Sequence, residues 1–353
     1  MDGILKRILL FAVILCSCGR MEDGIELFKP SITSTEATAT AHSVILKALV
    51  DKSPEVSDYG FYFTEGDNVR KIAANNLAEG RFICTITDLP PETSFVFRAF
   101  IGNGVAEILS DEQTVTTLKE PAPTDIVEIP DPTLRQYVLW YFDANKDGYL
   151  SVAEAFTINK IDVQSDDVAS LGGIEYFRNL ESLSVNGIAN DENLPSNGKL
   201  TKVDLSSNPK LNDVSFNYQN ISEINLSCNT EITRFGMFKC PISKIDISAL
   251  SKIQQFGAGY CQLDSIDLSH NPNLDDVHLD KNKLQRITIG KNESIHYLDL
   301  THNLLKEVDI SGCPNLRELY CTENPYLETV YVRTGQVFSV FKCDSHVKIV
   351  TKD

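Results

Sequence analysis

The second half of the chain repeats an apolar pattern at a fixed interval. The pattern Leu-x-x-Leu-x-Leu-x-x-Asn recurs from about Leu180, for example as LTKVDLSSN from Leu200 and IHYLDLTHN from Ile295. Its first apolar position falls at 200, 211, 221, 232, 242, 253, 263, 274, 284, 295, 305, 316, 327 and 337, so long and short steps alternate almost without exception. One long and one short step together make the repeating unit, which contains the half-pattern twice. A helical period of 3.6 residues cannot generate this spacing.

Such a unit predicts a coil with one extended segment on each side. Three apolar residues of each half point inward, and the chain turns at the Asn, whose amide can bond the backbone of the neighbouring coil. Stacking coils about 4.8 Å apart pairs equivalent segments as parallel strands. The repeat resembles the leucine-rich repeat family, and within it the nested 21-residue class of bacterial surface proteins. This resemblance covers residues 157–353 and implies a solenoid.

The repeat also assigns positions to several of the nine cysteines. Cys240, Cys261 and Cys313 stand where the turn Asn is expected, and Cys321 replaces an inward Leu. They are interpreted as small buried hydrophobic residues. Cys240 and Cys261 are one coil apart, which leaves a disulfide between them open. No CxxC pair is present, so a zinc or redox motif is unsupported.

The two half-repeats differ in their outward residues. One series carries short polar residues in the middle of the segment, mostly Asp, as at Asp204, Asp246 and Asp267. The other series is variable and carries aromatic and basic residues. Exposed aromatics on a rigid sheet are typical of recognition surfaces, although scattered surface aromatics need no functional explanation. The candidate binding face comprises Arg234, Phe238, Tyr260, His278, Tyr297, Arg317 and Tyr320.

A segment before the repeats, DANKDGYLSVAE at 143–154, has oxygen donors at the spacing of a calcium loop. Gly148 permits a sharp turn, and Leu150 is expected to point inward. The predicted ligands are Asp143, Asn145, Asp147, the Tyr149 carbonyl, Ser151 and Glu154. The segment resembles an EF-hand; the alternative is a loop that keeps its turn without metal.

A helix over 132–142, capped by Asp131 and opened by Pro132, leads into this loop. Only one such loop is visible, and the segment after it is short because repeat spacing begins near Ile158. Residues 131–156 are therefore expected to form a cap on the first coil, in which Ca²⁺ has a structural role.

Residues 30–118 contain short alternating apolar runs separated by Gly, Pro, Asn and Asp. Phe82, Cys84 and Ile86 alternate with polar residues, as do Phe95 and Phe97. This pattern predicts a β-sandwich of about seven strands. LPPETSFVFRAF resembles a turn of the fibronectin type III family, although Phe95 stands where that family usually has a tyrosine. A spacer role is favoured over ligand binding, and residues 119–130 form a Pro-marked linker.

The N-terminus has basic residues, an apolar run from Ile8 to Leu15, and then Cys16-Ser17-Cys18. That run is too short to span a bilayer. Residues 1–18 resemble a bacterial lipoprotein signal, which implies a mature protein lipidated at Cys18, with residues 19–29 as a tether. The alternative is an ordinary secretory signal. The expected location is the bacterial cell envelope, as an outer membrane lipoprotein exposed at the surface.

The formal net charge of −17 argues against nucleic acid as a partner. HExxH, GxSxG and phosphate-loop motifs are absent from the sequence, and no pair of carboxylates stands out as catalytic. The predicted fold is mainly β, with a fibronectin III/Ig-like β-sandwich, an EF-hand-like cap and a leucine-rich repeat solenoid with parallel strands. The expected function is non-enzymatic binding of a protein or peptide through the solenoid. Carbohydrate binding is the first alternative and a hydrolase the second, and the membrane is contacted through the lipid anchor only.

Overall fold

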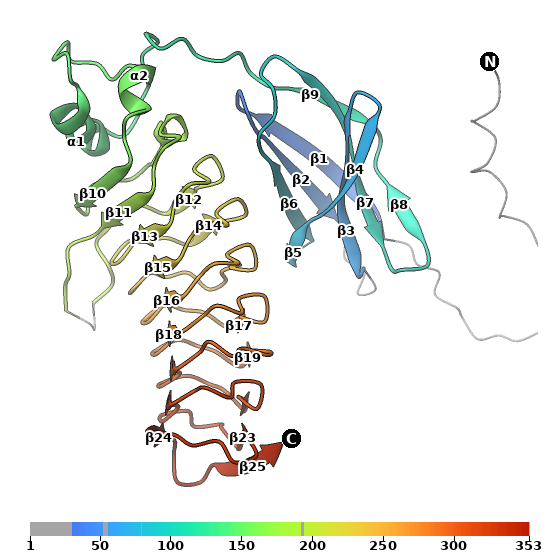
Figure 1. The fold of residues 1–353 in the computed structure, drawn as a ribbon, viewed down its shortest axis with the longest axis vertical. Coiled ribbons are helices and arrows are strands. Elements are labelled where there is room, and N and C mark those ends of the chain that lie inside the picture. Colours follow the sequence, from blue (N-terminus) through green and yellow to red (C-terminus); the bar gives the residue numbers. More distant parts are fainter. Residues whose placement is uncertain (1–29, 52–55, 79, 192–193, 353) are drawn as a thin grey trace, which may run out of the picture.

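The computed structural model describes residues 30–51, 56–78, 80–191 and 194–352. An antiparallel β-domain leads through two short helices into a long solenoid of stacked coils (Figure 1). The predicted signal segment 1–18 with Cys18, and the tether 19–29, lie outside the described residues. The chain is thus mainly β, with a solenoid of parallel strands as its largest part.

Two antiparallel sheets build the first domain. One has the order β1-β2-β6-β5, and the other has the order β4-β3-β7-β8, with β9 also pairing with β7. The strands are β1 Ile32–Ala39, β2 Val44–Val50, β3 Asp58–Glu65, β4 Asn68–Ala73, β5 Asn75–Ala78, β6 Arg81–Ile86, β7 Ser94–Gly102, β8 Glu107–Leu109 and β9 Gln113–Thr116.

The inward faces of both sheets share one apolar core. Phe61 and Phe63 of β3 pack with Phe82 of β6 and with Phe95 and Phe97 of β7, and all five rings are buried. The predicted alternation in β6 and β7 is confirmed, because a strand directs every second side chain to the same face. The assignment to the fibronectin type III family stays a prediction.

A short helical cap follows the linker. Helix α1 spans Pro132–Phe142 and helix α2 spans Val152–Ala155. Asp131 Oδ1 accepts hydrogen bonds from the amides of Thr133 and Leu134, which confirms the predicted N-cap. Asp131 Oδ2 accepts from the amide of Ala169 at 2.8 Å, so the same carboxylate fastens the helix to the solenoid.

The solenoid is built on a nine-stranded parallel sheet, which lies on the side away from the first domain (Figure 1). Its strands in order are β10 Lys160–Gln164, β11 Ser182–Asn186, β13 Asp213–Ser215, β15 Arg234–Gly236, β16 Gln255–Gly257, β18 Asp276–His278, β20 Tyr297–Asp299, β22 Glu318–Tyr320 and β24 Val340–Lys342. The aromatic half-repeats form this sheet.

The second half-repeats form shorter parallel sheets on the opposite side. These are β12 Lys202–Asp204 with β14 Glu223–Asn225, β17 Ser265–Asp267 with β19 Arg286–Thr288, and β21 Glu307–Asp309 with β23 Thr329–Arg333 and β25 Lys348–Lys352. A single 3₁₀ turn in the described chain, Ile174–Tyr176, lies between β10 and β11.

Apolar side chains fill the space between the two sides. Every predicted first apolar position from Leu200 to Leu327 is buried. The turn amides bond one coil back as expected: Nδ2 of Asn282, Asn303 and Asn324 donates to the carbonyls of Ala258, Leu279 and Leu300 at 2.7–2.9 Å. A second ladder on the other side includes Asn208, Asn229 and Asn271.

The predicted places of the cysteines are confirmed. Cys240 Sγ and Cys261 Sγ donate to the carbonyls of Phe216 and Met237 at 3.0 and 3.1 Å, in place of the ladder amide. Cys313 and Cys321 are fully buried. All described cysteines are free thiols, Cys240 and Cys261 included.

One position in six successive coils adopts a left-handed backbone conformation. The residues recur once per unit and have φ values between 51° and 59°: Tyr218, Lys239, Tyr260, Lys281, His302 and Glu323. Positive φ is uncommon for residues other than glycine. The amide of Tyr260 in this turn donates to the carbonyl of Asp280 in the next coil, so neighbouring coils hold the turn in place.

The last coil departs from the predicted spacing. Val337, expected to point inward, is 82% exposed. Tyr297 of β20 is aligned with Glu318 of β22, and Glu318 is aligned with Val340 of β24. The second separation is one residue longer than the first. The last coil therefore contains one additional residue, and its inward position lies one residue later than predicted. Phe338 takes the inward place and packs on the core together with Phe341.

The first domain contacts the solenoid on the side of β12 and β14 (Figure 1). Thr85 Oγ1 of β6 lies 3.1 Å from Ser227 Oγ, just after β14. Arg178 Nη1 donates to Glu120 Oε1 of the linker at 3.0 Å. Neither of these two contacts involves a residue of the nine-stranded sheet. None of the helices in the described ranges has the length and apolar character needed to cross a membrane.

Candidate functional site

Four of the seven candidate binding residues lie in strands of the nine-stranded sheet, while Phe238 and Tyr260 lie beyond the ends of β15 and β16, and Arg317 directly precedes β22. Strand register aligns the inward row Phe235, Phe256, Val277, Leu298 and Leu319, so the residues on either side of it point outward. We call this surface the aromatic face, and it carries Arg234, Phe238, Tyr260, His278, Tyr297, Arg317 and Tyr320. Its rings fall into two groups.

The first ring group lies beyond the ends of β15 and β16. The centroids of Phe238 and Tyr260 are 4.8 Å apart, and those of Phe238 and Tyr218 are 5.4 Å apart. Gly259 leaves room for this group, because a Cβ there would lie 2.7 Å from Asp280 Oδ1 and 3.5 Å from the Phe238 ring. The three rings are half-buried and form a continuous patch across three coils.

The second ring group crosses β18, β20 and β22. The ring centroid of Tyr297 lies 4.8 Å from that of His278 and 5.5 Å from that of Tyr320, with the planes tilted by about 40° in both pairs. His278 Nε2 lies 3.0 Å from Asp276 Oδ1. His278 is exposed, and the two tyrosines are half-buried.

Carboxylates surround the second ring group and set its electrostatics. Burial, and then the charge of Asp299, raises the pKa of Tyr297 to about 12, with Asp276 and Asp280 adding to the effect. The pKa of the Asp280 carboxyl is also raised, first by burial and then by Asp299, although His278 and Lys281 oppose the shift. Burial and the neighbouring carboxylates thus act on Tyr297 in the same direction.

The two arginines of the aromatic face have different surroundings. Arg234 Nη2 donates to Asp213 Oδ2 of the preceding coil at 2.5 Å, so this guanidinium takes part in an ion pair. Arg317 directly precedes β22 and is exposed. Its amide donates to the carbonyl of His296, which fixes its backbone beside the second ring group.

The opposite side of the solenoid uses its outward acids differently. Asp246 Oδ1 and Asp267 Oδ1 accept hydrogen bonds at 2.9 Å from the amides of Ser248 and Ser269, two residues further on. Asp204, Asn225 and Asp309 repeat this contact. The uniform Asp series is thus explained by turn formation.

Sequence reasoning missed Tyr218 and the lysines of the aromatic face. Tyr218 and Tyr260 occupy the same position of the coil, two units apart, so aligning the successive units would have found it. Lys281 Nζ lies 4.2 Å from the Tyr260 ring centroid, Lys342 Nζ lies 5.4 Å from that of Tyr320, and Lys239 Nζ lies 5.8 Å from that of Tyr218.

The candidate calcium loop has its oxygen donors bonded to its own backbone. Asp143 Oδ2 accepts from the Gly148 amide, Asp147 Oδ1 from the Tyr149 amide and Glu154 Oε2 from the Ser151 amide, all at 2.9 Å. The Ser151 amide is the main reason why the pKa of the Glu154 carboxyl is lowered, so this group is ionised at neutral pH.

The loop matches calcium in donor type. Each of the predicted ligands has an oxygen atom to offer, as Ca²⁺ prefers, Gly148 has a φ of 86°, and Leu150 is buried as predicted. Asn145 bonds Asp147 through its Nδ2, and the Tyr149 side chain is exposed. In the described ranges, however, no three His, Cys, Asp or Glu side chains are gathered closely enough to hold an ion. The types of donor atom in the loop therefore fit calcium. In this structure, however, its carboxylates accept hydrogen bonds from backbone amides and do not converge on one point.

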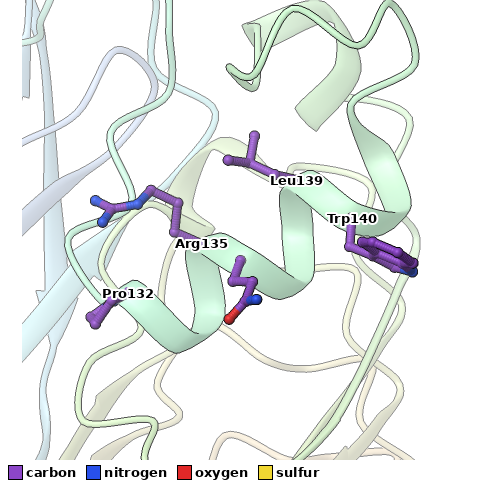
Figure 2. A pocket seen from close by; sticks show the side chains of 5 residues that line it. Pro132, Arg135, Leu139 and Trp140 are labelled. Carbon is purple, nitrogen blue, oxygen red and sulfur yellow. The ribbon is translucent and has the colours of Figure 1, made fainter.

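A shallow depression lies on the outer side of α1. Its lining residues are Pro132, Arg135, Gln136, Leu139 and Trp140. Arg135 and Trp140 point away from each other along the helix (Figure 2), and Trp140 is 83% exposed. This surface has no converging polar groups and therefore offers no geometry for catalysis.

Comparison with known proteins finds solved structures of low similarity. No protein-family model and no curated protein matches the chain. The functional domain of InlJ from Listeria monocytogenes, described as including a cysteine ladder, is 19% identical, with a TM-score of 0.35 over 64% of this chain and 62% of that chain. An internalin (inlF) from Listeria monocytogenes is 17% identical, with a TM-score of 0.22 over 66% of this chain and 98% of that chain. Both of these structural neighbours are internalins, and the second half of this chain is a β-solenoid consistent with leucine-rich repeats by its own strand order and register.

Proposed function

We propose that this chain is a non-enzymatic, lipid-anchored protein of a bacterial cell surface, and that its aromatic face binds a protein or peptide partner. The observation that carries the proposal is the gathering of five candidate rings into two contacting groups along the nine-stranded sheet. Half-buried tyrosines on a rigid sheet bind well, because little side-chain freedom is lost when a partner covers them.

The contrast between the two sides of the solenoid supports this assignment. The opposite side has outward acids that serve its own turns, and part of that side contacts the first domain. The aromatic face varies from coil to coil and presents rings, lysines and carboxylates. Variation along a regular frame is what recognition of one partner requires.

The test introduces a photo-crosslinking amino acid at Phe238 or at Ser269, on opposite sides of the full mature chain. The partner captured at Phe238 is then titrated against Tyr297→Ala and Tyr320→Ala. Each variant is expected to weaken binding by about 1–3 kcal/mol, while Asp246→Ala and Asp267→Ala have little effect. The reverse ranking, or crosslinks at Ser269 alone, would refute the assignment.

Carbohydrate binding is the competing proposal, since sugar rings stack on aromatic side chains. The lysines over Tyr218, Tyr260 and Tyr320 disfavour it, because they occupy ring faces that a sugar would need. A glycan array probed with the mature chain separates the two proposals: binding lost in Tyr297→Ala would support the carbohydrate.

The remaining parts of the proposal concern the ends of the solenoid. The lipid on Cys18 attaches the chain to the membrane, and the first domain acts as a spacer. We further propose that Asp143, Asn145, Asp147, Tyr149, Ser151 and Glu154 hold one structural Ca²⁺. The bridge between Ile126 and Ser151, and the 2.8 Å hydrogen bond from the Val127 amide to the Leu150 carbonyl, tie this loop to the linker. An ion there would fix the cap on the first coil.

A further inference from the structure

The tyrosines of the solenoid show a repeated pairing with lysine. Tyr218 and Tyr260 each have a lysine ammonium over the ring, contributed by the equivalent residue of the next unit, Lys239 and Lys281. Tyr320 has Lys342 over its ring, from the residue aligned with it in β24. On the opposite side, Lys352 Nζ lies 3.5 Å from the Tyr331 centroid. The fold therefore places a cation from the next coil over these four rings.

Tyr297 departs from this pattern. The residue aligned with Tyr297 in the next coil is Glu318 of β22. By contrast, the residue aligned with Tyr320 in the next coil is a lysine, Lys342 of β24. Within the described part of the chain, no lysine or arginine lies over the Tyr297 ring. Its neighbours on the face are the His278 and Tyr320 rings, which lean against it from two sides.

The charges around Tyr297 are mainly negative. Asp276 lies on β18, Asp299 on β20 and Glu318 on β22, and Asp280 follows β18. On the basic side, His278 faces Asp276 at 3.0 Å, His296 pairs with Asp275 at 2.6 Å, Lys281 lies over Tyr260, and Arg317 stands before β22. Asp276 and Tyr297 are aligned in neighbouring strands, as are Tyr297 and Glu318, so carboxylates flank the Tyr297 position on both sides.

We propose that the surface formed by Tyr297, Asp276, Asp280, Asp299 and Glu318, the Tyr297 site, receives an arginine side chain from a basic segment of the protein partner. This inference rests on the proposed function and specifies the chemistry of its partner. A guanidinium can stack on a tyrosine ring and donate to two carboxylates in the same plane. A lysine ammonium satisfies only part of this arrangement. The strongly acidic chain also attracts a basic segment over longer distances.

The test measures binding of synthetic peptides to the full mature chain by fluorescence anisotropy at about 0.15 M salt, where the Debye length is about 8 Å. One peptide alternates arginine with glycine and serine; two others carry lysine or glutamate instead. The arginine peptide is expected to bind more tightly than the lysine peptide, and the glutamate peptide is expected not to bind. Equal binding of the arginine and lysine peptides would overturn the assignment to arginine.

Two substitutions with matched controls locate the site. Glu318→Lys supplies the lysine that the other tyrosines already have, and it should weaken binding of the arginine peptide by about tenfold or more. Glu307→Lys makes the same charge change at the first residue of β21, on the opposite side, and should change binding by less than about twofold.

Asp299→Asn should weaken binding by about fivefold. Its control is Asp267→Asn, because Asp299 and Asp267 each accept a 2.9 Å hydrogen bond from the amide two residues later, which Asn can keep. Equal effects of either variant and its control would show general charge attraction and overturn the proposal.

The outcomes separate this inference from the proposed function. If Tyr297→Ala and Tyr320→Ala weaken a captured partner while Glu318→Lys and Asp299→Asn do not, the aromatic face binds but the arginine assignment is wrong. If none of the four variants affects a captured partner, the proposed function itself is wrong.

Discussion

Truncation of Asn303 tests the amide ladder that joins the coils. Asn303 is 2% exposed. Its Nδ2 donates to the carbonyls of Leu279 at 2.9 Å and Leu300 at 3.1 Å, and its Oδ1 accepts from the Leu284 amide at 3.0 Å. In Asn303→Ala the two carbonyls keep a second partner, since Asn282 and Asn324 also donate to them.

The cost of this substitution follows from which groups lose their partners. The Leu284 amide becomes a buried donor without an acceptor, which costs about 1–3 kcal/mol, and the lost Nδ2 bonds add about 1 kcal/mol. We therefore expect Asn303→Ala to lower the free energy of unfolding by about 2–4 kcal/mol. Asn303→Cys should cost roughly half as much, because a cysteine keeps a donor here: Cys240, at the same position of its coil, donates to the Phe216 carbonyl.

Urea denaturation followed by circular dichroism measures these differences. The control is Asn315→Ala, whose Nδ2 also donates to a backbone carbonyl, that of Glu293 at 2.7 Å, but at an exposed site. It should stay within about 0.5 kcal/mol of the parent protein. Equal losses for Asn303→Ala and Asn303→Cys, or a loss for Asn303→Ala as small as that of the control, would refute the ladder argument.

Three further predictions concern the metal, the thiols and the anchor. Millimolar Ca²⁺ added after EDTA should raise the melting temperature, by the equivalent of about 2.7 kcal/mol at a hundredfold excess over Kd. The variant Glu154→Gln can still accept the hydrogen bond from the Ser151 amide but should lose this shift in melting temperature. If the parent protein shows no shift, the proposal of a bound calcium ion is wrong. Burial raises the pKa of Cys261 and Cys313 to about 12 in the folded chain. In the unfolded chain the same thiols ionise at lower pH, from about 8.5. The free energy of unfolding should therefore fall as the pH rises from about 8.5 towards 12. Cys261→Asn should reduce this dependence of stability on pH, measured by denaturation at a series of pH values. An unchanged dependence would show that the Cys261 thiol is not its cause. Cys18→Ala should release the protein from membranes, and a variant that still sediments with membranes and incorporates labelled fatty acid would show that the lipid is elsewhere.

The repeated positions of the solenoid were predictable because the same physical requirement recurs in every coil. An inward residue must be apolar and a turn residue must bond the neighbouring coil, so Leu200 to Leu327 and the cysteines at Asn positions follow from the spacing. The helix 132–142 was predictable from Asp131 and Pro132. Val337 was predicted wrongly: the additional residue lies before β23, where the predicted position Leu327 already allows for it, but the following step was taken one residue too short and the inward place is Phe338.

The chemistry of the aromatic face was only partly predictable. Tyr297 and Tyr320 stand out as outward aromatics in the sequence, but their contacts depend on the register between coils and on how far each side chain leans. The lysines over Tyr218, Tyr260 and Tyr320 could not be assigned from one segment at a time. The membrane anchor and the calcium ion stay predictions.

The fixed register has a consequence for how such a face can evolve. The Gln254 amide donates to the carbonyl of Thr233 in the coil before it, and the Asp275 amide donates to the carbonyl of Gln254 in the same way, both at 2.8 Å. If residues 254–274 were deleted or duplicated, each backbone amide at the junction would still meet a carbonyl in the equivalent position of the neighbouring coil. The distance between the two ring groups can thus change only in whole coils, about 4.8 Å at a time. Recombination sets the spacing of the contact points in discrete steps, while point substitutions on the outward rows change their chemistry independently of the frame.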